Sequence, residues 1–181
     1  MYTFHYQLTL DDHFDHRLCL NYTLPAFRKK IMMQKYLNPL LFIVWAILLG
    51  FIFGHFPNVY IFSGAISIGW ILIFRKRVVR NIHKSLKITS ESGKSPFNSS
   101  DVVTVFDEEK IRTDTVDSEA SFNYSAIEKI VTGPNALYLY INATTAFILP
   151  YRIFASEEEK DSFLQFIKEK TNAPVIAGVT K

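Results

Sequence analysis

The sequence predicts a hairpin of two membrane-spanning helices joined to a small soluble α+β domain. The runs at residues 36–56 and 59–74 contain no charged side chain. Each is long enough to cross most of a bilayer core about 30 Å thick, which predicts the hairpin. From residue 101 onward, short alternating strands are followed by one amphipathic helix, which predicts the α+β domain. The expected divisions are an N-terminal strand and helix (1–35), the hairpin (36–74), a basic helix and linker (75–98), the α+β domain (99–172) and a tail (173–181).

The N-terminal segment is expected to form a strand and then a helix. Residues 3–9 alternate apolar and polar side chains, the period of a half-buried strand. Thr9 and Asp12 have the spacing of an N-cap and the third position of a helix, which stops near Pro25. The pattern leaves open whether this strand joins the C-terminal sheet. The first residues lack the features of a cleavable signal peptide, so the first apolar run is expected to be a retained signal-anchor.

The expected N-terminal helix carries the few residues with metal-binding or nucleophilic chemistry. His13 and His16 are three positions apart, with acidic residues around them, and could present nitrogen ligands on one face. No second ligand cluster accompanies them, so an exposed, solvated pair is the simpler expectation, and we predict no metal site. Cys19 is the only cysteine, which excludes an intramolecular disulfide or a cysteine zinc site. Its apolar neighbours predict buried packing rather than a nucleophile.

Charge placement around the hairpin predicts its orientation. The connecting turn at residues 55–58 has no lysine or arginine, whereas both outer flanks are basic. By the positive-inside rule, both termini are expected on the cytoplasmic side of a bacterial cell membrane. The basic residues after the second run, Arg75, Lys76, Arg77 and Arg80 among them, could contact anionic lipid head groups. Topology alone also explains the cluster, and this is the simpler expectation.

Small residues recur every four positions in both runs. The pairs are Gly50 with Gly54, Ser63 with Ser67, and Ala65 with Gly69. Such spacing allows helix backbones to approach closely in lipid. Packing within the hairpin is the main expectation, and a homodimer contact is the alternative that the pattern leaves open.

The C-terminal part is expected to contain six strands and a helix. The strands are expected at 102–106, 111–116, 120–124, 127–131, 137–141 and 145–149. Ser156 and Glu159 have the spacing of a capping box at the start of the closing helix. Phe163, Phe166 and Ile167 form its apolar stripe.

This order of elements, with the segments 124–130 and 138–170, resembles the YcxB-like family of bacterial membrane proteins. The most specific part is residues 147–150, FILP, followed by Phe154 and the glutamate-rich helix start. Tyr124 stands where such families often have tryptophan, which we interpret as a packing change. The resemblance implies a C-terminal fold similar to the pleckstrin-homology domain, and it implies a location but no activity.

The functional prediction is a membrane-anchored interaction module rather than an enzyme. The sequence has no glycine-rich phosphate loop, no Gly-x-Ser-x-Gly elbow and no cysteine–histidine nucleophile pair. Residues 1–98 carry 12 basic and 4 acidic side chains, whereas residues 99–172 carry 7 and 13. We expect no cofactor and no nucleic acid partner, and we expect a protein partner or a homo-oligomer at the inner membrane surface.

Three alternative functions are less well supported by the sequence. Immunity against membrane-active, bacteriocin-like peptides rests on fold analogy alone. An oligomeric pore is disfavoured because no ionisable residue is expected to face the membrane interior. Inositol-phosphate binding is disfavoured because the first hairpin turn, at residues 107–110, is acidic. An extended peptide that adds to an open sheet edge remains a use of the fold.

Overall fold

The chain is described by a computed structural model that covers residues 1–181 except 55–56, 92–100, 116–117 and 179–181. It divides into two compact units. We call Leu24–Lys84 the hairpin unit, and Met1–Thr23 together with Ser85–Lys181 the α+β unit. The N-terminal strand and helix therefore belong to the same unit as the C-terminal domain, although the expected divisions separated them.

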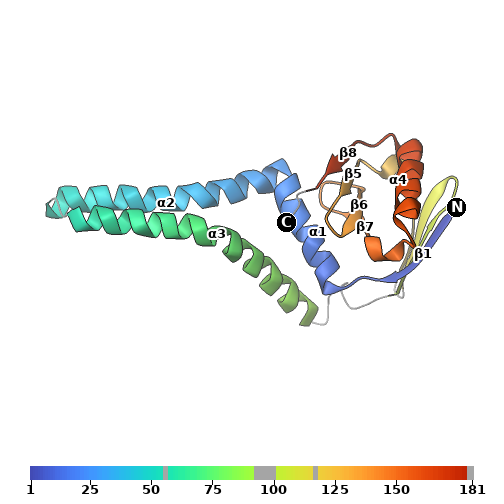
Figure 1. Cartoon of the computed structure of the whole chain (residues 1–181), viewed down its shortest axis with the longest axis horizontal. Helices are drawn as coiled ribbons and strands as arrows, with labels where there is room; N and C mark the ends of the chain where they lie inside the picture. Colours follow the sequence, from blue (N-terminus) through green and yellow to red (C-terminus); the bar gives the residue numbers. More distant parts are fainter. Residues whose placement is uncertain (55–56, 92–100, 116–117, 179–181) are drawn as a thin grey trace. The chain divides into compact units, whose positions relative to one another are not determined.

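Two long apolar helices form the hairpin, as predicted. Helix α2 spans Pro25–Phe53 and helix α3 spans Pro57–Glu91, and the two lie side by side (Figure 1). Pro25 suits the first position of α2, where the missing N–H costs no hydrogen bond. Helix α3 continues through the basic stretch after residue 74, which confirms the predicted basic helical extension. Residues 89–91 were expected in a linker but are helical, and the rest of that linker lies outside the described residues.

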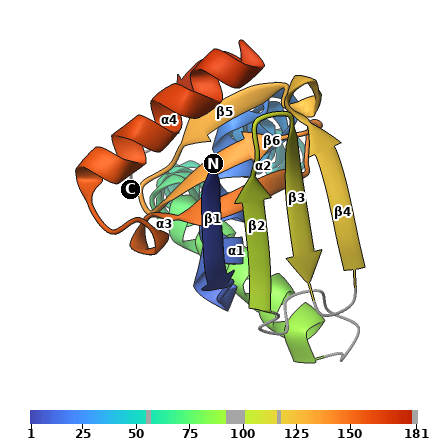
Figure 2. The same ribbon diagram turned by 90° about the vertical axis from the view of Figure 1, so that its right-hand side faces the viewer.

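The strands of the α+β unit form two four-stranded sheets. The first has the order β1-β2-β3-β4 and is antiparallel throughout (Figure 2). Its strands are β1 (Tyr2–Gln7), β2 (Asp101–Phe106), β3 (Lys110–Thr115) and β4 (Ser118–Asn123). The second has the order β7-β6-β5-β8. Its strands are β5 (Lys129–Thr132), β6 (Ala136–Tyr140), β7 (Ala146–Pro150) and β8 (Val175–Ala177).

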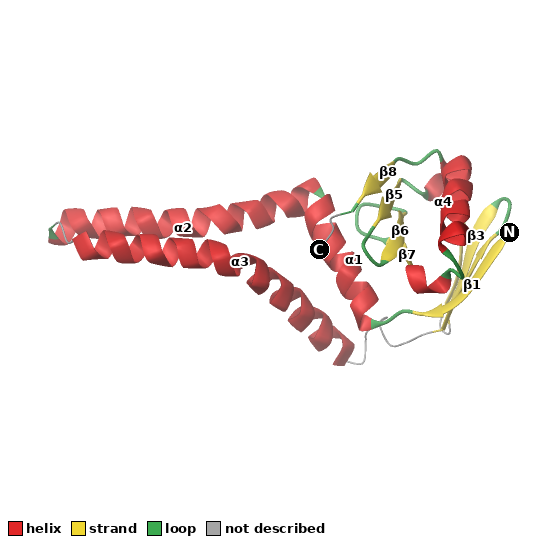
Figure 3. Cartoon of the chain, in the orientation of Figure 1, coloured by secondary structure: helices red, strands yellow, loops and turns green. Residues whose placement is uncertain are grey.

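Four helical segments complete the unit (Figure 3). They are α1 (Leu10–Thr23), α4 (Glu157–Thr171) and the short 3-10 turns η1 (Tyr124–Ala126) and η2 (Tyr151–Ile153). Both predicted caps are present. The Asp12 backbone N–H donates to Thr9 Oγ1, and the Thr9 N–H donates to Asp12 Oδ2. The Glu159 N–H donates to Ser156 Oγ, and the Ala155 N–H donates to the Glu159 carboxylate.

Strand predictions were largely confirmed, with three corrections. Tyr124, the expected end of the third strand, lies in the turn η1. The expected fourth strand at 127–131 begins only at Lys129, because Ile127 caps that turn, its N–H donating to the Tyr124 oxygen. The expected tail contains a strand, β8, which pairs in parallel with β5. The N-terminal strand, whose partner the sequence left open, pairs along its whole length with β2.

One apolar core joins both sheets to α4. The ring of Phe163, fully buried on α4, lies 5.2 Å from the ring of Phe4 on β1 and 4.9 Å from that of Phe106 on β2. Ile130 on β5 and Leu149 on β7 belong to the same cluster. Because the core draws on β1 and on residues after 100, the two ends of the chain fold together.

Candidate functional site

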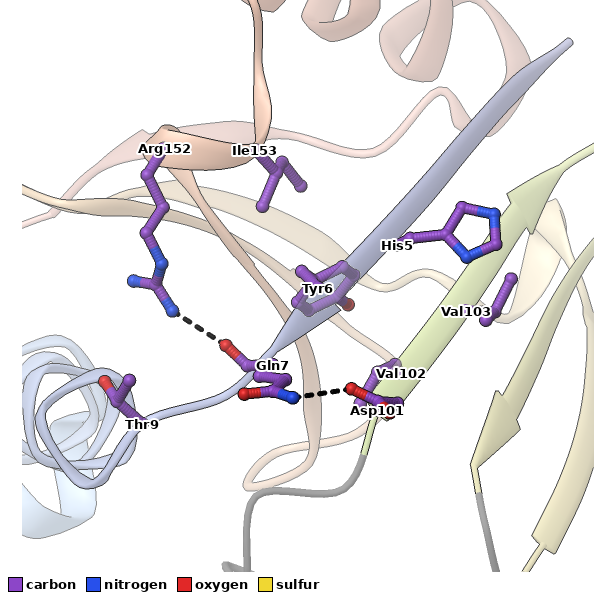
Figure 4. A pocket seen from close by; sticks show the side chains of 9 residues that line it. All are labelled: His5, Tyr6, Gln7, Thr9, Asp101, Val102, Val103, Arg152 and Ile153. Atoms are coloured by element: carbon purple, nitrogen blue, oxygen red, sulfur yellow. Dashed lines mark hydrogen bonds between the residues drawn. The ribbon is translucent and has the colours of Figure 1, made fainter.

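A pocket of about 890 Å³ opens where β1 ends (Figure 4). Its walls come from three places: β1 with Thr9 just beyond it, the start of β2, and η2. The side-chain amide of Gln7 donates to the carboxylate of Asp101, its partner across the last rung of the β1–β2 ladder, at 2.7 Å. A volume of this size is within the usual range for small-molecule sites.

An ion pair between Arg152 and Asp12 closes one side of this pocket. Arg152 donates from Nη1 to Asp12 Oδ1 at 2.7 Å and from Nη2 to Asp12 Oδ2 at 2.6 Å. The same Nη2 also donates to the backbone oxygen of Gln7 at 2.8 Å. The Asp12 side chain is 7% exposed and that of Arg152 is 49% exposed. This bidentate pair therefore ties η2 to the junction between β1 and α1.

At Asp12, hydrogen bonds together lower the pKa of the carboxyl by more than burial raises it. Burial raises the pKa of this carboxyl, but hydrogen bonds from Arg152 and Thr9 hold it below its ordinary value overall. The hydrogen bond to Asp12 raises the pKa of Arg152. Asp12 compensates the charge of Arg152, and the neutral amide of Gln7 leaves the negative charge of Asp101 unmatched, so the pocket has no unmatched positive charge from Arg152. Such a groove suits neutral polar groups better than a phosphate, which would need unmatched positive charge.

The histidines of α1 do not form the exposed pair that the sequence suggested. His13 and His16 are both partly buried. The His16 ring lies 5.3 Å from the ring of Tyr138 and 5.7 Å from that of Tyr140, both on β6. Cys19 is 4% exposed, which confirms its predicted burial. Helix α1 thus packs these side chains against the second sheet.

This packing leaves polar atoms without partners in the described part of the chain. They are His16 Nε2 and Tyr138 Oη. Burial, with smaller contributions from His13 and Arg17, lowers the pKa of His16 to about 4. The ring is therefore neutral near pH 7. Among the described residues, no group of three or more histidine, cysteine, aspartate or glutamate side chains could hold a metal ion.

The small residues of the hairpin have different surroundings. Gly50 is buried, and a Cβ there would overlap Tyr60 Oη, so the Tyr60 side chain of α3 packs against α2 at this point. Gly54 ends α2 with a φ of 93°, and Cβ atoms at Gly54 and Gly69 would meet nothing within 4 Å. Ala65 is exposed. Of the four candidates, only Gly50 lies at the contact between the two helices.

Two serines bind α3 to α2. The Ser63 hydroxyl donates to the Phe42 backbone oxygen at 2.9 Å, and the Ser67 hydroxyl contacts the Pro39 backbone oxygen at 3.2 Å. Both serines are buried. Interhelical hydrogen bonds of this kind stabilise helix pairs in lipid. The serine pair noted in the sequence therefore packs within the hairpin.

The candidate lipid contacts lie on the surface of α3. Arg75, Lys76, Arg77 and Arg80 are all exposed. The guanidinium of Arg77 lies 4.8 Å from the Trp70 ring centroid, a cation–π contact. The other three remain candidates for head-group or topology contacts.

The acidic turn between β2 and β3 is held by hydrogen bonds and basic side chains. Arg112 pairs with Asp107 at 3.1 Å, and Lys170 donates to the Glu108 backbone oxygen at 3.0 Å. The Tyr124 hydroxyl donates to the Asp107 backbone oxygen at 2.6 Å. Tyr124 is 5% exposed and therefore has the packing role expected of it.

Sequence reasoning missed the pocket and its ion pair. It placed Asp12 at a helix cap but gave Arg152 no role, since 140 positions separate the two residues. The clearest signal in the sequence was Arg152, because an arginine that closely follows a buried apolar strand often pairs with a carboxylate.

Comparison with known proteins identifies one region. Residues 106–167 match the family model of YcxB-like proteins. The match begins at the last residue of β2 and ends within α4, so it covers the greater part of both sheets but neither β1 nor the hairpin. No curated protein and no solved structure matches the chain.

Proposed function

We propose that the YcxB-like domain formed by residues 106–167 is the interaction part of a membrane-anchored module, which the hairpin holds at the cytoplasmic face of a bacterial membrane. The partner of this module is a protein. The observation that carries the proposal is the exposure of large apolar side chains along both long helices.

The hairpin has the surface of helices that lie in lipid. Its two candidate spans, Phe27–Phe53 and Pro57–Thr89, contain 18-residue windows with mean hydropathies of 2.2 and 1.6, and 17% of each window is buried. A core helix of a soluble protein would be mostly buried. Trp45 is 62% exposed, Phe51 79% and Leu72 74%. Leaving this much apolar surface in water would be strongly unfavourable, whereas a bilayer covers it.

Orientation follows from the charges that flank the spans. Among the described residues near the turn between α2 and α3 there is no lysine or arginine, whereas the exposed basic residues of α3 lie beyond its apolar part. The positive-inside rule therefore favours a cytoplasmic α+β unit. Arg75, Lys76 and Arg80 would then lie near the anionic inner leaflet, where each charge contributes about 1 kcal/mol.

An interaction role fits the chemistry of the domain. It resembles a pleckstrin-homology fold in its run of antiparallel strands closed by a helix, although β1 and β8 come from outside the family match. Its acidic first turn disfavours anionic lipid as the ligand. The first sheet ends at β1 and β4 and the second at β7 and β8, and a further strand could add at β4 or β8.

Selective cysteine labelling tests the anchoring. In a Cys19→Ser background, Asn58→Cys lies at the start of α3 and Ser121→Cys lies on β4, and both positions are exposed. A membrane-impermeant maleimide should label Asn58→Cys on intact cells but Ser121→Cys only after permeabilisation. Labelling of Ser121→Cys on intact cells, or a chain that stays soluble without detergent, contradicts the proposal.

Chemical crosslinking in native membranes tests the interaction role. We expect purification of the full chain to recover crosslinked adducts, because the domain is held where partners are concentrated. Recovery of the uncrosslinked monomer alone, with no adduct of any kind, contradicts this part of the proposal.

A further inference from the structure

Strand β8 is a sheet edge without the usual protection. Among the described residues it pairs only with β5. Val175 and Ile176 are each 39% exposed, and Ala177 is exposed as well. Natural edge strands are commonly blocked by charged residues, prolines or bulges, and β8 contains none of these.

The edge of the other sheet provides a contrast. Strand β4 also lies at the end of its sheet, but it carries Glu119 together with Ser121 and Asn123, all exposed. A charged and polar edge of this kind resists further pairing. Of these two edges, β8 is therefore the one that favours the addition of a further strand.

The hydrogen bonds to β5 determine which groups of β8 remain available. Ile130 N–H donates to the Pro174 oxygen at 3.0 Å, and Gly178 N–H donates to the Thr132 oxygen at 2.8 Å. Backbone groups alternate in direction along a strand, so residues 174, 176 and 178 face β5. Val175 and Ala177 therefore direct their N–H and C=O groups away from β5, toward the open side.

We propose that β8 pairs with β8 of a second copy of this chain, in antiparallel orientation about a two-fold axis that passes beside Ile176. This inference rests on the proposed function and identifies the partner as the chain itself. The strand is uncharged and apolar, so its self-pairing places no like charges opposite each other. Two-fold symmetry is also the commonest symmetry of homo-oligomers.

The available groups fix the register. Val175 of one copy exchanges two hydrogen bonds with Ala177 of the other, and symmetry repeats the exchange. Ile176 then lies opposite the Ile176 of the second copy as a non-hydrogen-bonded pair, the arrangement with the shorter Cα separation. The β7-β6-β5-β8 sheets of the two copies thereby join into one continuous sheet.

Membrane anchoring makes so short an interface sufficient. Three residues per copy bury little surface, which would give a weak dimer in free solution. Two chains held in one membrane plane meet at a raised effective concentration, so a weak contact forms without further interface.

Disulfide trapping tests the register. In the Cys19→Ser background, full-length Ile176→Cys and Val175→Cys chains are oxidised in native membranes and compared on non-reducing gels. The proposed pairing brings the two Ile176→Cys thiols to bonding distance, whereas the two Val175→Cys thiols lie on opposite sides of the axis. We expect about tenfold more dimer for Ile176→Cys. Since both positions are 39% exposed, random collision predicts equal yields.

A charge substitution provides a second measurement. Ile176→Lys places two like charges opposite each other at the axis, and we expect it to lower the yield of amine-crosslinked dimer about fivefold, with Val175→Lys less affected. Equal disulfide yields at 175 and 176, no dimer at either, or an unchanged yield for Ile176→Lys overturns the inference. If the chain remains in the membrane and forms adducts with other proteins, the proposed function survives. A chain in the soluble fraction overturns the proposed function instead.

Discussion

At the scale of single residues, the pair formed by Arg152 and Asp12 joins parts of the chain that lie far apart in sequence. We expect Arg152→Gln to destabilise the α+β unit, because it leaves the Asp12 carboxylate buried without its main partner. The expected loss is about 2 kcal/mol, a value between those for breaking an exposed and a buried ion pair. Arg112→Gln is the control, since the side chains of the Arg112–Asp107 pair are 56% and 35% exposed and the pair should contribute under about 0.5 kcal/mol. Thermal unfolding of the detergent-solubilised chain, followed by far-UV circular dichroism, measures both. Equal losses contradict this account.

The His16 ring predicts how stability depends on pH. Burial lowers its pKa from 6.5 to about 4. Between these values the unfolded chain binds a proton that the folded chain excludes, so stability is full above pH 6.5 and falls as the pH drops toward 4. We expect a loss of about 2 kcal/mol between pH 7 and pH 5 from this residue.

A variant isolates the contribution of His16. His16→Phe keeps an aromatic ring against Tyr138 and Tyr140 but cannot bind a proton. Its unfolding midpoint should change less between pH 7 and pH 5 than that of the unmodified chain. His5→Phe, at an exposed position of β1, should retain the full change. Parallel pH profiles for all three chains would exclude His16 as the cause.

The sequence could predict local residue roles but not tertiary partners. Thr9, Asp12, Ser156 and Glu159 were assigned correctly because a cap depends on residues three positions apart. The ring contacts of His16 depend on strand β6, which is more than 120 positions away. The local pattern of polar residues on a helix face was therefore interpreted as solvated, although the helix packs against a sheet.

At the scale of elements, the contact between α2 and α3 at Gly50 gives a further prediction. Gly50→Val should weaken the hairpin by about 1–3 kcal/mol, because its side chain would overlap Tyr60. Gly69→Val is the control, since a Cβ at that position meets nothing within 4 Å. Thermal unfolding of the helical signal in detergent measures the difference.

A compensating change makes the Gly50 prediction specific. Tyr60→Ala in the Gly50→Val chain removes the ring that causes the overlap and should restore part of the lost stability. If Gly69→Val lowers the stability of the hairpin as much as Gly50→Val does, overlap with Tyr60 does not explain the importance of the small residues. A homodimer contact along Ala65 and Gly69, which the sequence left open, would then account for it.

Elements were predicted well where they are long or strongly alternating. The two apolar helices are long, and the strands β2 and β3 alternate between more and less buried residues, whereas β6 and β7 are short apolar runs between turns. Strand β8 was missed because three residues after Pro174 show too little pattern, and its pairing with β5 depends on the path of α4. The end of the strand before β5 was misplaced because Tyr124 continues the alternation of Ala120 and Phe122, although it begins η1.

At the scale of the whole molecule, the α+β unit is discontinuous in sequence. Met1–Thr23 and Ser85–Lys181 form it together, with the hairpin inserted between them. Loop-closure entropy grows slowly with loop length, so an insertion of this size costs little beyond its own folding. The alternating pattern at residues 3–9 predicted a strand but could not identify β2 as its partner, since antiparallel pairing at long range leaves no local signal.

This organisation predicts which fragments fold without a membrane. A chain in which Leu24–Lys84 are replaced by a Gly/Ser linker of about 20 residues should be soluble and folded, because it retains β1, α1 and the whole core. Residues 99–181 alone should not fold, because they lack Phe4, which is 5% exposed and contacts the rings of Phe106 and Phe163. Loss of such a side chain alone costs about 3–5 kcal/mol, a large share of a small domain's stability. Dispersed amide signals in a two-dimensional NMR spectrum would show folding of the linked chain, and equally dispersed signals from residues 99–181 would contradict the requirement for β1.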